Sequence, residues 1–311
     1  MADFVDASLI MLKEKAKVGM PIYKVWPGKN RFYCGGRCIA GPWSDVSAQC
    51  CVFICTAAAV GVYFGIFAYK LATQVSVWLP ITFAMTVMTL IAFYILTHCT
   101  DPGFIPRRYF MMLKLVNRSP EQIEELAGEK LNILSRDASK EKEASAQCST
   151  CRVHRPPRSS HCSDCGNCLE VSDHHCPFVG TCVGRRNYRY FCMFLLMVVI
   201  SMIYLIVQII IFYTIKSDDS TDSPSTTVIV IICVVGIPIG ILLLTLIGFC
   251  TFHLWLTCRG KTTREFIKKR IRPTDSDQGD IQENEWFTVS RPYINYSYKL
   301  TEEDIERIRQ L

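Results

Sequence analysis

Long apolar runs dominate the pattern of hydrophobic and polar positions along this chain of 311 residues, half of which are hydrophobic. Four runs that are almost free of charge cover Val46–Tyr69, Val75–His98, Tyr190–Tyr213 and Val228–Leu256. Each has at least 18 residues, and an apolar helix of that length can cross a hydrocarbon core of about 30 Å. The pattern therefore predicts an α-helical integral membrane protein with four transmembrane helices, rather than a soluble protein with buried helices.

Polar segments separate the four runs and divide the chain into predicted domains. Each boundary is set where the composition changes from apolar to polar. The domains are an N-terminal segment (1–45), spans 1 and 2 (46–98), a linker (99–147), a cysteine-rich domain (148–191), spans 3 and 4 (190–256) and a C-terminal tail (257–311). The sequence contains no internal repeat, so we expect one cysteine-rich domain between spans 2 and 3.

The basic residues predict the orientation of the spans. Of the 34 Lys and Arg residues, only Lys70 and Lys216 lie in the short loops that follow spans 1 and 3, and the other 32 lie elsewhere outside the spans. Cytoplasmic loops carry the Lys and Arg excess, so we expect both termini and the cysteine-rich domain in the cytosol. The net charge of +6 indicates attraction to anionic lipid or acidic ligands, not to nucleic acid, and the basic run Lys268–Arg272 is expected to anchor to the inner leaflet.

Three short helices are expected outside the spans. Residues 3–17 form a helix that lies on the membrane or on the folded domain, because one of its faces carries Val5, Leu9, Leu12 and Ala16. Ser119, followed by a proline and then by Gln122, is typical of a helix start. Thr301 and Asp304 have the spacing of a second such start, before a short last helix.

The stretch from Cys148 to Phe191 is expected to carry the chemistry. The spacing pattern contains seven cysteines from Cys148 to Cys182, together with His161 and the neighbouring His174 and His175. Zinc takes four thiolate or imidazole ligands, and pairs of cysteines spaced by two residues suit a tetrahedral site. Six cysteines and two histidines would fill two sites of three cysteines and one histidine, which leaves one cysteine and one histidine over. Cytosolic thiols stay reduced, which agrees with the predicted orientation.

The residues left over by this count suggest a nucleophile. They are His174 and Cys176, and Asp173 precedes them. A cysteine near a histidine, with a carboxylate that orients the imidazole, is the arrangement of an activated thiolate. A thiol with an ordinary pKa of about 8.5 is mostly protonated at neutral pH, and a paired imidazole lowers that pKa. We therefore expect a metal-braced scaffold that holds a Cys-His-Asp site.

The spacing from Cys148 to Phe191 resembles that of the cysteine-rich domain in the DHHC family of protein S-acyltransferases (palmitoyltransferases). Upstream, Asp101-Pro102-Gly103 resembles the DPG motif of the family, and downstream Thr262-Thr263-Arg264-Glu265 resembles its TTxE motif. The segment from Tyr23-Lys24-Val25-Trp26 to Gly35-Gly36-Arg37 is similar to the Golgi and plant branch, which lacks ankyrin repeats. The resemblance implies a two-step acyl transfer to cysteine thiols of membrane-associated proteins through an acyl-Cys176 intermediate.

The resemblance also implies roles for individual residues. The family's two interleaved zinc sites fall on Cys148, Cys151, His161 and Cys168, and on Cys162, Cys165, His175 and Cys182. Both sites would be closed and structural, because four protein ligands leave no open position for a substrate. Cys176 would be the nucleophile, with His174 as its base and Asp173 orienting the histidine. Supporting roles fall on Asp101, on Asn187 and on Thr263, which would bond to Asp173.

Long-chain acyl-CoA is the donor that the resemblance implies. Its phosphates require cations, and the candidates are Arg155, Arg158, Arg185, Arg186 and Arg189. Each of these arginines is an equally good candidate for a lipid-headgroup contact. Four spans with few lumenal residues suit Golgi or ER endomembranes and the plasma membrane equally, and the sequence does not identify an accessory subunit. Phe178 stands where the family usually has Trp, and Gly180-Thr181 replaces a more common pair of asparagines.

Two other functions fit parts of the sequence. A membrane-anchored zinc module would recruit partners without catalysis, but the zinc count does not require Asp173, His174 or Cys176. A transporter or channel would need ionisable residues that line a path through the spans. The four apolar runs lack such acidic or basic residues, which argues against this function. Outside the motif, Cys34 and Cys38 lie in a glycine-rich turn and are expected as small buried side chains, with lipidation or metal support as alternatives. Palmitoylation is an option for the membrane-boundary cysteines Cys50, Cys51, Cys55 and Cys99.

Overall fold

The computed structural model describes residues 7–127, 147–156, 158–218, 234, 236–267 and 291–311. The described residues form two compact units. One unit combines the described parts of Met1–Val46, His98–Tyr188 and Thr262–Leu311, and the other combines Ser47–Thr97 with the described parts of Arg189–Lys261. We call them the cysteine-rich unit and the spanning unit. Residues 128–146 of the predicted linker, the basic run 268–272, and residues 228–233 and 235 of the predicted fourth span lie outside the described residues.

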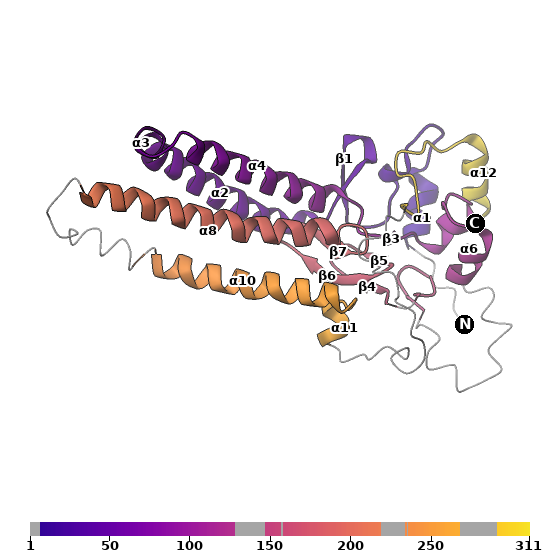
Figure 1. Cartoon of the computed structure of the whole chain (residues 1–311). Helices are drawn as coiled ribbons and strands as arrows, with labels where there is room; N and C mark the ends of the chain where they lie inside the picture. The colour runs from indigo at the N-terminus through magenta and orange to yellow at the C-terminus, as the bar shows by residue number, and fades with distance from the viewer. Residues whose placement is uncertain (1–6, 128–146, 157, 219–233, 235, 268–290) are drawn as a thin grey trace. The chain divides into compact units, whose positions relative to one another are not determined.

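The spanning unit contains four helices that are long and apolar enough to cross a membrane. The first is continuous over Trp43–Gln74 and includes α2 (Val46–Val62), a π-helical turn (Tyr63–Phe67) and α3 (Ala68–Gln74). The others are α4 (Trp78–Cys99), α8 (Tyr188–Asp218) and α10 (Ile237–Cys258), and Figure 1 shows α8 running between α4 and α10. The four predicted membrane helices are confirmed.

Polar contacts link the helices within the spanning unit. The Tyr63 hydroxyl donates a hydrogen bond to the side-chain oxygen of the fully buried Gln208. Thr82 and Tyr204 share a hydrogen bond of 2.5 Å between their hydroxyls. Because lipid offers no hydrogen-bond partners, such groups must satisfy one another within the protein. Tyr63, Gln208, Thr82 and Tyr204 therefore link helices within this unit.

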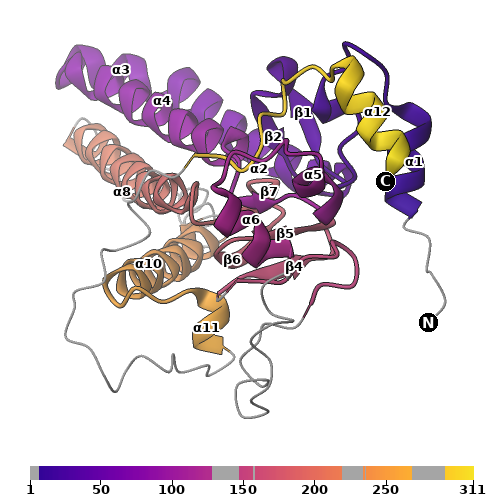
Figure 2. The ribbon, with the colours of Figure 1, turned by 90° about the vertical axis from the view of Figure 1, so that its right-hand side faces the viewer.

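Three small antiparallel sheets form the frame of the cysteine-rich unit. The first pairs β1 (Arg31–Tyr33) with β2 (Cys38–Ala40), so that Tyr33 lies opposite Cys38. The second has the order β3-β5-β4, with β3 at Phe104–Ile105, β4 at Ser160–Cys162 and β5 at Asn167–Leu169. The third pairs β6 (Ser172–Cys176) with β7 (Thr181–Gly184). Figure 2 shows β4, β5 and β6 gathered in one part of this unit.

Short helices surround these sheets. The α-helices are α1 (Ala7–Lys15), α5 (Arg108–Met112), α6 (Pro120–Ala127), α11 (Thr263–Ile267) and α12 (Glu302–Gln310). Single 3-10 turns lie at Ile22–Lys24, Cys34–Gly36 and Trp43–Asp45. Both predicted helix starts are confirmed, because Ser119 and Gln122 cap each other's backbone amides before α6, and Thr301 and Asp304 do so before α12.

The core of the cysteine-rich unit joins residues that are far apart in the sequence. Trp26 stacks on Phe110 with 5.5 Å between the ring centroids, and Tyr296 meets the same indole edge-on at 5.0 Å. Leu12 of α1 and Ile308 of α12 are buried in this core as well. The predicted first helix therefore packs on the folded domain, which was one of its two expected positions.

A disulfide joins Cys38 of β2 to Cys99 at the end of α4. The expectation of small buried side chains is right for Cys38 and wrong for Cys34, whose side chain is exposed. Cys99, expected as a membrane-boundary palmitoylation candidate, is instead half-buried and bonded to Cys38. The sequence led us to expect reduced thiols and did not predict this disulfide. Sequence alone does not show which cysteines the fold brings together.

Candidate metal centres and catalytic site

The first candidate metal centre consists of Cys148, Cys151, His161 and Cys168. His161 on β4 lies opposite Cys168 on β5, and the two cysteines of the preceding loop complete the group. His161 Nδ1 is 3.5 Å from the sulfurs of Cys148 and Cys151 and 3.7 Å from that of Cys168. A tetrahedron with zinc–sulfur bonds of about 2.3 Å and zinc–nitrogen bonds of about 2.0 Å has edges of about 3.5 Å between nitrogen and sulfur. The donor set and spacing therefore fit one zinc ion.

The second candidate metal centre consists of Cys162, Cys165, His175 and Cys182. His175 on β6 lies opposite Cys182 on β7, and Cys162 ends β4. His175 Nδ1 is 3.5 Å from the sulfurs of both Cys165 and Cys182, which is the same fit to a tetrahedral edge. The two groups are the sets of four that the family resemblance implied. Their ligands interleave along the chain because adjacent residues of one strand, such as His161 and Cys162, point to opposite faces.

A carboxylate supports the second centre from outside. Asp45, which is buried, accepts a hydrogen bond of 3.1 Å from His175 Nε2. Because Nδ1 faces the three sulfurs, this bond fixes the ring orientation and makes Nδ1 a better ligand. Sequence reasoning missed Asp45, because it lies 130 residues before its partner and belongs to no motif.

The strand that carries His175 also carries the predicted Asp173, His174 and Cys176. The pairing of β6 with β7 is irregular between Ser172 and His174, so Asp173 is an extra residue without a partner in the register. Such a bulge redirects side chains, and here it lets two consecutive residues meet. His174 Nδ1 lies 2.6 Å from Asp173 Oδ2. The other oxygen of this buried carboxylate accepts a hydrogen bond of 2.8 Å from the backbone amide of Thr263.

The alternation of β6 explains how two neighbouring histidines are separated. His174 and Cys176 are two residues apart and share a face, whereas His175 points to the opposite face and to the metal ligands. Asp173 occupies Nδ1 of His174, which leaves Nε2 for the hydrogen bond with Cys176. Cys176 belongs to neither group of metal ligands. The three residues are thus in contact in the order Asp173, His174, Cys176.

Opposing effects set the protonation of this pair. Burial raises the pKa of the Cys176 thiol, but the hydrogen bond and positive charge of His174 outweigh it and lower the pKa below its ordinary value. Burial lowers the pKa of His174, whereas its bonds to Asp173 and Cys176 raise it, with a net pKa of about 9. Near neutral pH the site therefore favours an imidazolium beside a thiolate, which is the form of an activated cysteine.

A tight turn follows Cys176 and is held from two sides. Gly180 has a φ of 63°, a conformation that glycine adopts without steric cost, and its amide donates to the carbonyl of Cys176 at 2.9 Å. The Gly180 carbonyl accepts a 2.7 Å bond from the amide of Gly41. The Val179 carbonyl accepts a 2.7 Å bond from His98 Nδ1. Sequence reasoning missed both supports, because neither Gly41 nor His98 lies in the cysteine motif.

Comparison with known proteins agrees with this geometry. The model of the DHHC palmitoyltransferase domain matches residues 141–270. Over residues 141–270, the chain is similar to the DHHC palmitoyltransferase family. It is 37% identical over 180 residues to human palmitoyltransferase ZDHHC18, and the aligned residues cover 56% of this chain and 45% of that protein. It is 29% identical over 305 residues to probable protein S-acyltransferase 2 of Arabidopsis thaliana, which covers 92% of this chain and 72% of that protein.

A fission-yeast relative extends the comparison. Palmitoyltransferase erf2 of Schizosaccharomyces pombe is 37% identical over 186 residues, which cover 58% of this chain and 51% of that protein. The chain thus spans about half the length of the human and yeast relatives. The match to the family model includes both candidate metal centres and the Asp173–Cys176 segment.

The residues expected in supporting roles of the DHHC family hold backbone in place. Asp101 accepts bonds from the amides of Gly103 and Phe104 at 2.8 and 3.0 Å, and its second oxygen pairs with Arg186 at 2.9 Å. Asn187 is fully buried and bonds to the amide of Gly184 and the carbonyl of Cys182, so it links the end of β7 to the start of α8. Thr263 meets Asp173 through its amide and not through its hydroxyl.

Several of the five arginines proposed for the acyl-CoA phosphates are engaged within the protein. Arg158 pairs with Glu265 at 2.7 Å, and Arg185 pairs with Glu170 at 3.1 Å. Arg186 pairs with Asp101, as above. Arg189 donates to the hydroxyl of Tyr190 at 2.7 Å. Arg155 is half-buried in the loop before β4. A phosphate that approached Arg158, Arg185 or Arg186 would therefore compete with a carboxylate.

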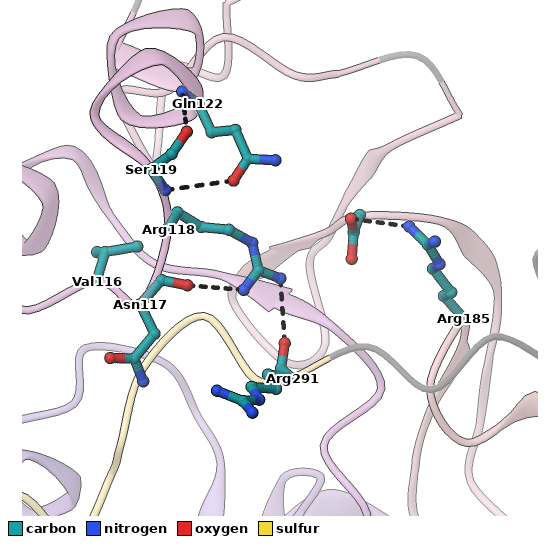
Figure 3. Close-up of a pocket in the computed structure, with 8 residues that line it drawn as sticks. Val116, Asn117, Arg118, Ser119, Gln122, Arg185 and Arg291 are labelled. Atoms are coloured by element: carbon teal, nitrogen blue, oxygen red, sulfur yellow. Dashed lines mark hydrogen bonds and ion pairs between the residues drawn. The ribbon is translucent and has the colours of Figure 1, made fainter.

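A pocket of about 820 Å³ opens on the cysteine-rich unit, away from Cys176. Its lining includes Arg118, Arg185, Arg291 and Glu170, and Figure 3 shows the first two on opposite sides. The guanidinium of Arg118 donates to the carbonyls of Asn117 and Arg291. Two of the three arginines that line the pocket thus have partners within the protein, Arg118 in carbonyls and Arg185 in Glu170.

Proposed function

We propose that this chain is a protein S-acyltransferase, which moves a long-chain fatty acyl group from acyl-CoA to cysteine thiols of membrane-associated proteins. One observation carries the proposal: Cys176 is in contact with His174, which is oriented by the buried Asp173, and none of the three is a ligand of either centre of three cysteines and one histidine. A domain that only bound partners through its metal centres would not require this arrangement. The names of the relatives agree with the proposal.

In the first step the thiolate of Cys176 attacks the thioester carbonyl of acyl-CoA. A new sulfur–carbon bond forms at Cys176, the bond to the CoA sulfur breaks, and CoA leaves as a thiolate. His174, which holds the proton from Cys176 on Nε2, donates it to the departing CoA sulfur. Asp173 keeps the ring in position through Nδ1 and stabilises the imidazolium before that proton leaves.

In the second step the acyl group passes to the protein substrate. A substrate cysteine gives its thiol proton to the now neutral His174, and its sulfur attacks the acyl-Cys176 thioester. The acyl–sulfur bond at Cys176 breaks, and Cys176 leaves as a thiolate beside the imidazolium. The site returns to its starting protonation state, so no additional acid or base is consumed.

Two zinc ions are the metals that we propose for the two centres. Each donor set of three cysteines and one histidine suits a closed tetrahedral site. Bound zinc would supply folding free energy by crosslinking the loops and strands that carry its ligands. Because His175 and Cys182 flank the Cys176 turn on β6 and β7, the second centre would also fix the position of the nucleophile.

The membrane and the acyl donor follow from the same proposal. We place both termini and the cysteine-rich unit in the cytosol, where acyl-CoA is available, because the Lys and Arg residues cluster on that side of the spans. Tags fused at either end should be digested by protease after selective permeabilisation of the plasma membrane, and a protected tag would contradict the four-span topology. The acyl-CoA phosphates would meet the arginine-rich loops, and an accessory subunit remains compatible with this arrangement.

Peptide mapping after labelling tests the proposal. The purified full chain would be incubated with an alkyne-tagged long-chain acyl-CoA and digested, and the hydroxylamine-labile label would be located by mass spectrometry. We expect the label on Cys176, and we expect transfer to a substrate protein only when that label forms. Cys34→Ser is the matched control, because Cys34 is exposed and belongs to neither metal centre. Absence of label from Cys176 would favour a binding module without catalysis.

A further inference from the structure

The Cys38–Cys99 disulfide connects two segments that the proposed reaction does not use. Cys38 lies on β2 of the N-terminal hairpin, and Cys99 lies 61 residues later at the end of α4. Neither residue belongs to a candidate metal centre. Cys99 is half-buried, so a soluble thiol or oxidant can approach its sulfur more easily than that of the buried Cys38.

Each of the two crosslinked segments donates a hydrogen bond to the turn that follows Cys176. His98, directly before Cys99, donates through Nδ1 to the carbonyl of Val179. Gly41, three residues after Cys38, donates through its amide to the carbonyl of Gly180. A Cβ on Gly41 would lie 2.7 Å from that carbonyl oxygen, so the approach needs glycine. The disulfide therefore ties together the two segments that hold the neighbouring peptide groups of Val179 and Gly180.

The clamped turn bears directly on the reactive sulfur. The backbone amides of Phe178 and Val179 are hydrogen-bonded to the sulfur of Cys176. The Gly180 amide also donates to the carbonyl of Cys176 at 2.9 Å. One face of the turn thus positions the cysteine, and the carbonyls on its other side are held by His98 and Gly41. A shift of either supporting segment would move the amides that face the sulfur.

We propose that Cys38 and Cys99 form a reversible redox site that controls how firmly the Cys176 turn is held. The inference rests on the proposed function, since it assigns a regulatory site to that reaction. On oxidation by hydrogen peroxide, the two thiols lose two electrons and two protons, one sulfur–sulfur bond forms, and two waters are released. On reduction, a dithiol gives two electrons and two protons to the pair and becomes a disulfide itself.

The cytosolic orientation proposed above exposes this disulfide to cellular reductants, so we expect it to be reversible. In the cytosol most disulfides are transient and serve catalysis or redox sensing. A crosslink between distant segments of a cytosolic unit would therefore form and break as the redox potential of the cytosol changes. The oxidised form holds the turn and supports acylation of Cys176, and the reduced form loosens it.

The experiment uses the purified full chain in lipid nanodiscs, equilibrated in glutathione buffers of graded redox poise. Mass-spectrometric mapping quantifies the Cys38–Cys99 crosslink, and the rates of acylation and of iodoacetamide alkylation at Cys176 are measured per free Cys176 thiol. We expect reduction to slow both rates together, by up to about tenfold, as small displacements of a reacting group do. Cys38→Ser and Cys99→Ser should match the reduced wild-type protein at every poise.

Cys34→Ser serves as the matched control, because Cys34 lies in the same hairpin, is exposed and forms no disulfide. It should keep the redox dependence of the wild-type protein. The proposal is overturned if the crosslink does not form, if the rates do not follow it, or if Cys38→Ser still responds to the poise. Redox-dependent alkylation of Cys176 without any acyl label would uphold this redox site and refute the proposed acyl transfer.

Discussion

The two candidate metal centres have the same donors but different neighbours. The first joins a loop to the hairpin of β4 and β5, and none of its ligands lies on β6 or β7, the strands next to the Cys176 turn. The second draws His175 and Cys182 from β6 and β7, the two strands that lead into and out of the Cys176 turn. In the described part of the chain, it alone has a buried carboxylate, Asp45, bonded to its histidine.

This difference shows how one short strand can serve structure and chemistry together. Along β6, His175 faces the metal ligands, whereas His174 and Cys176 face the other way. The bulge at Asp173 brings the carboxylate onto His174 without moving His175 from its sulfurs. With metal bound, the second centre would hold Asp173, His174 and Cys176 in register, and the first centre would brace the hairpin of β4 and β5.

Removing one ligand from each centre should give the largest effects and separate their roles. Because the free energy of zinc binding at such sites, about 10–16 kcal/mol in small peptides, is also folding free energy, each change should lower the metal content of the purified protein. Cys182→Ser should abolish acyl labelling, since it releases the strand after the Cys176 turn. Cys148→Ser should weaken labelling without abolishing it. Metal analysis and labelling of both variants would show this, and equal labelling of the two would contradict the distinction.

Cys176→Ser should separate the nucleophile from the centre beside it. The substitution leaves all eight candidate ligands in place, so the metal content and the thermal unfolding temperature should stay at wild-type values. Labelling and transfer should disappear, because a serine hydroxyl is a far poorer nucleophile than a thiolate at neutral pH. Loss of metal in this variant would mean that Cys176 is a ligand, and full transfer activity would mean that it is not the nucleophile.

His174→Ala tests the other face of the same strand. Loss of a general base typically costs a factor of about a hundred or more in rate, while His175 should still bind metal. Because His174 lowers the pKa of Cys176, the variant should need a higher pH to form thiolate. In the wild-type protein the rate should fall as the pH drops through the lowered pKa of Cys176, and in the variant that fall should occur at higher pH. The rate of iodoacetamide alkylation against pH measures this shift, and an unchanged profile would refute the pairing.

The sequence predicts a feature well when the residues that form it lie close together along the chain, and poorly when distant segments form it. The four spans were readable because each is one continuous apolar run. The eight candidate ligands and Asp173, His174 and Cys176 lie within one segment of recognisable spacing. Asp45, His98 and Gly41 carry no such signal, because they meet the segment only through the fold. The bulge that joins Asp173 to His174 and the Cys38–Cys99 pair were hidden for the same reason.

Asp45→Ala should give the smallest effect and test whether the carboxylate distinguishes the two centres. Loss of the hydrogen bond to His175 Nε2 should weaken metal binding at the second centre by about 10- to 100-fold, as changes to such supporting groups do. The first centre should keep its affinity, since Asp45 contacts none of its ligands in the described structure. Chelator competition, monitored as metal release, should therefore change from one slow phase to a fast and a slow phase of equal size.

Two variants make this test specific to the bond. Asp45→Asn keeps an oxygen that can accept from Nε2 but removes the charge, so its metal release should lie between those of the wild-type protein and Asp45→Ala. Asp164→Asn removes an exposed carboxylate between Cys162 and Cys165, and it should leave release unchanged because Asp164 does not orient His175. If Asp164→Asn accelerated release as much as Asp45→Ala, the effect would come from negative charge near the sulfurs. If both Asp45 variants released metal at the wild-type rate, the second centre would be held by its four ligands alone.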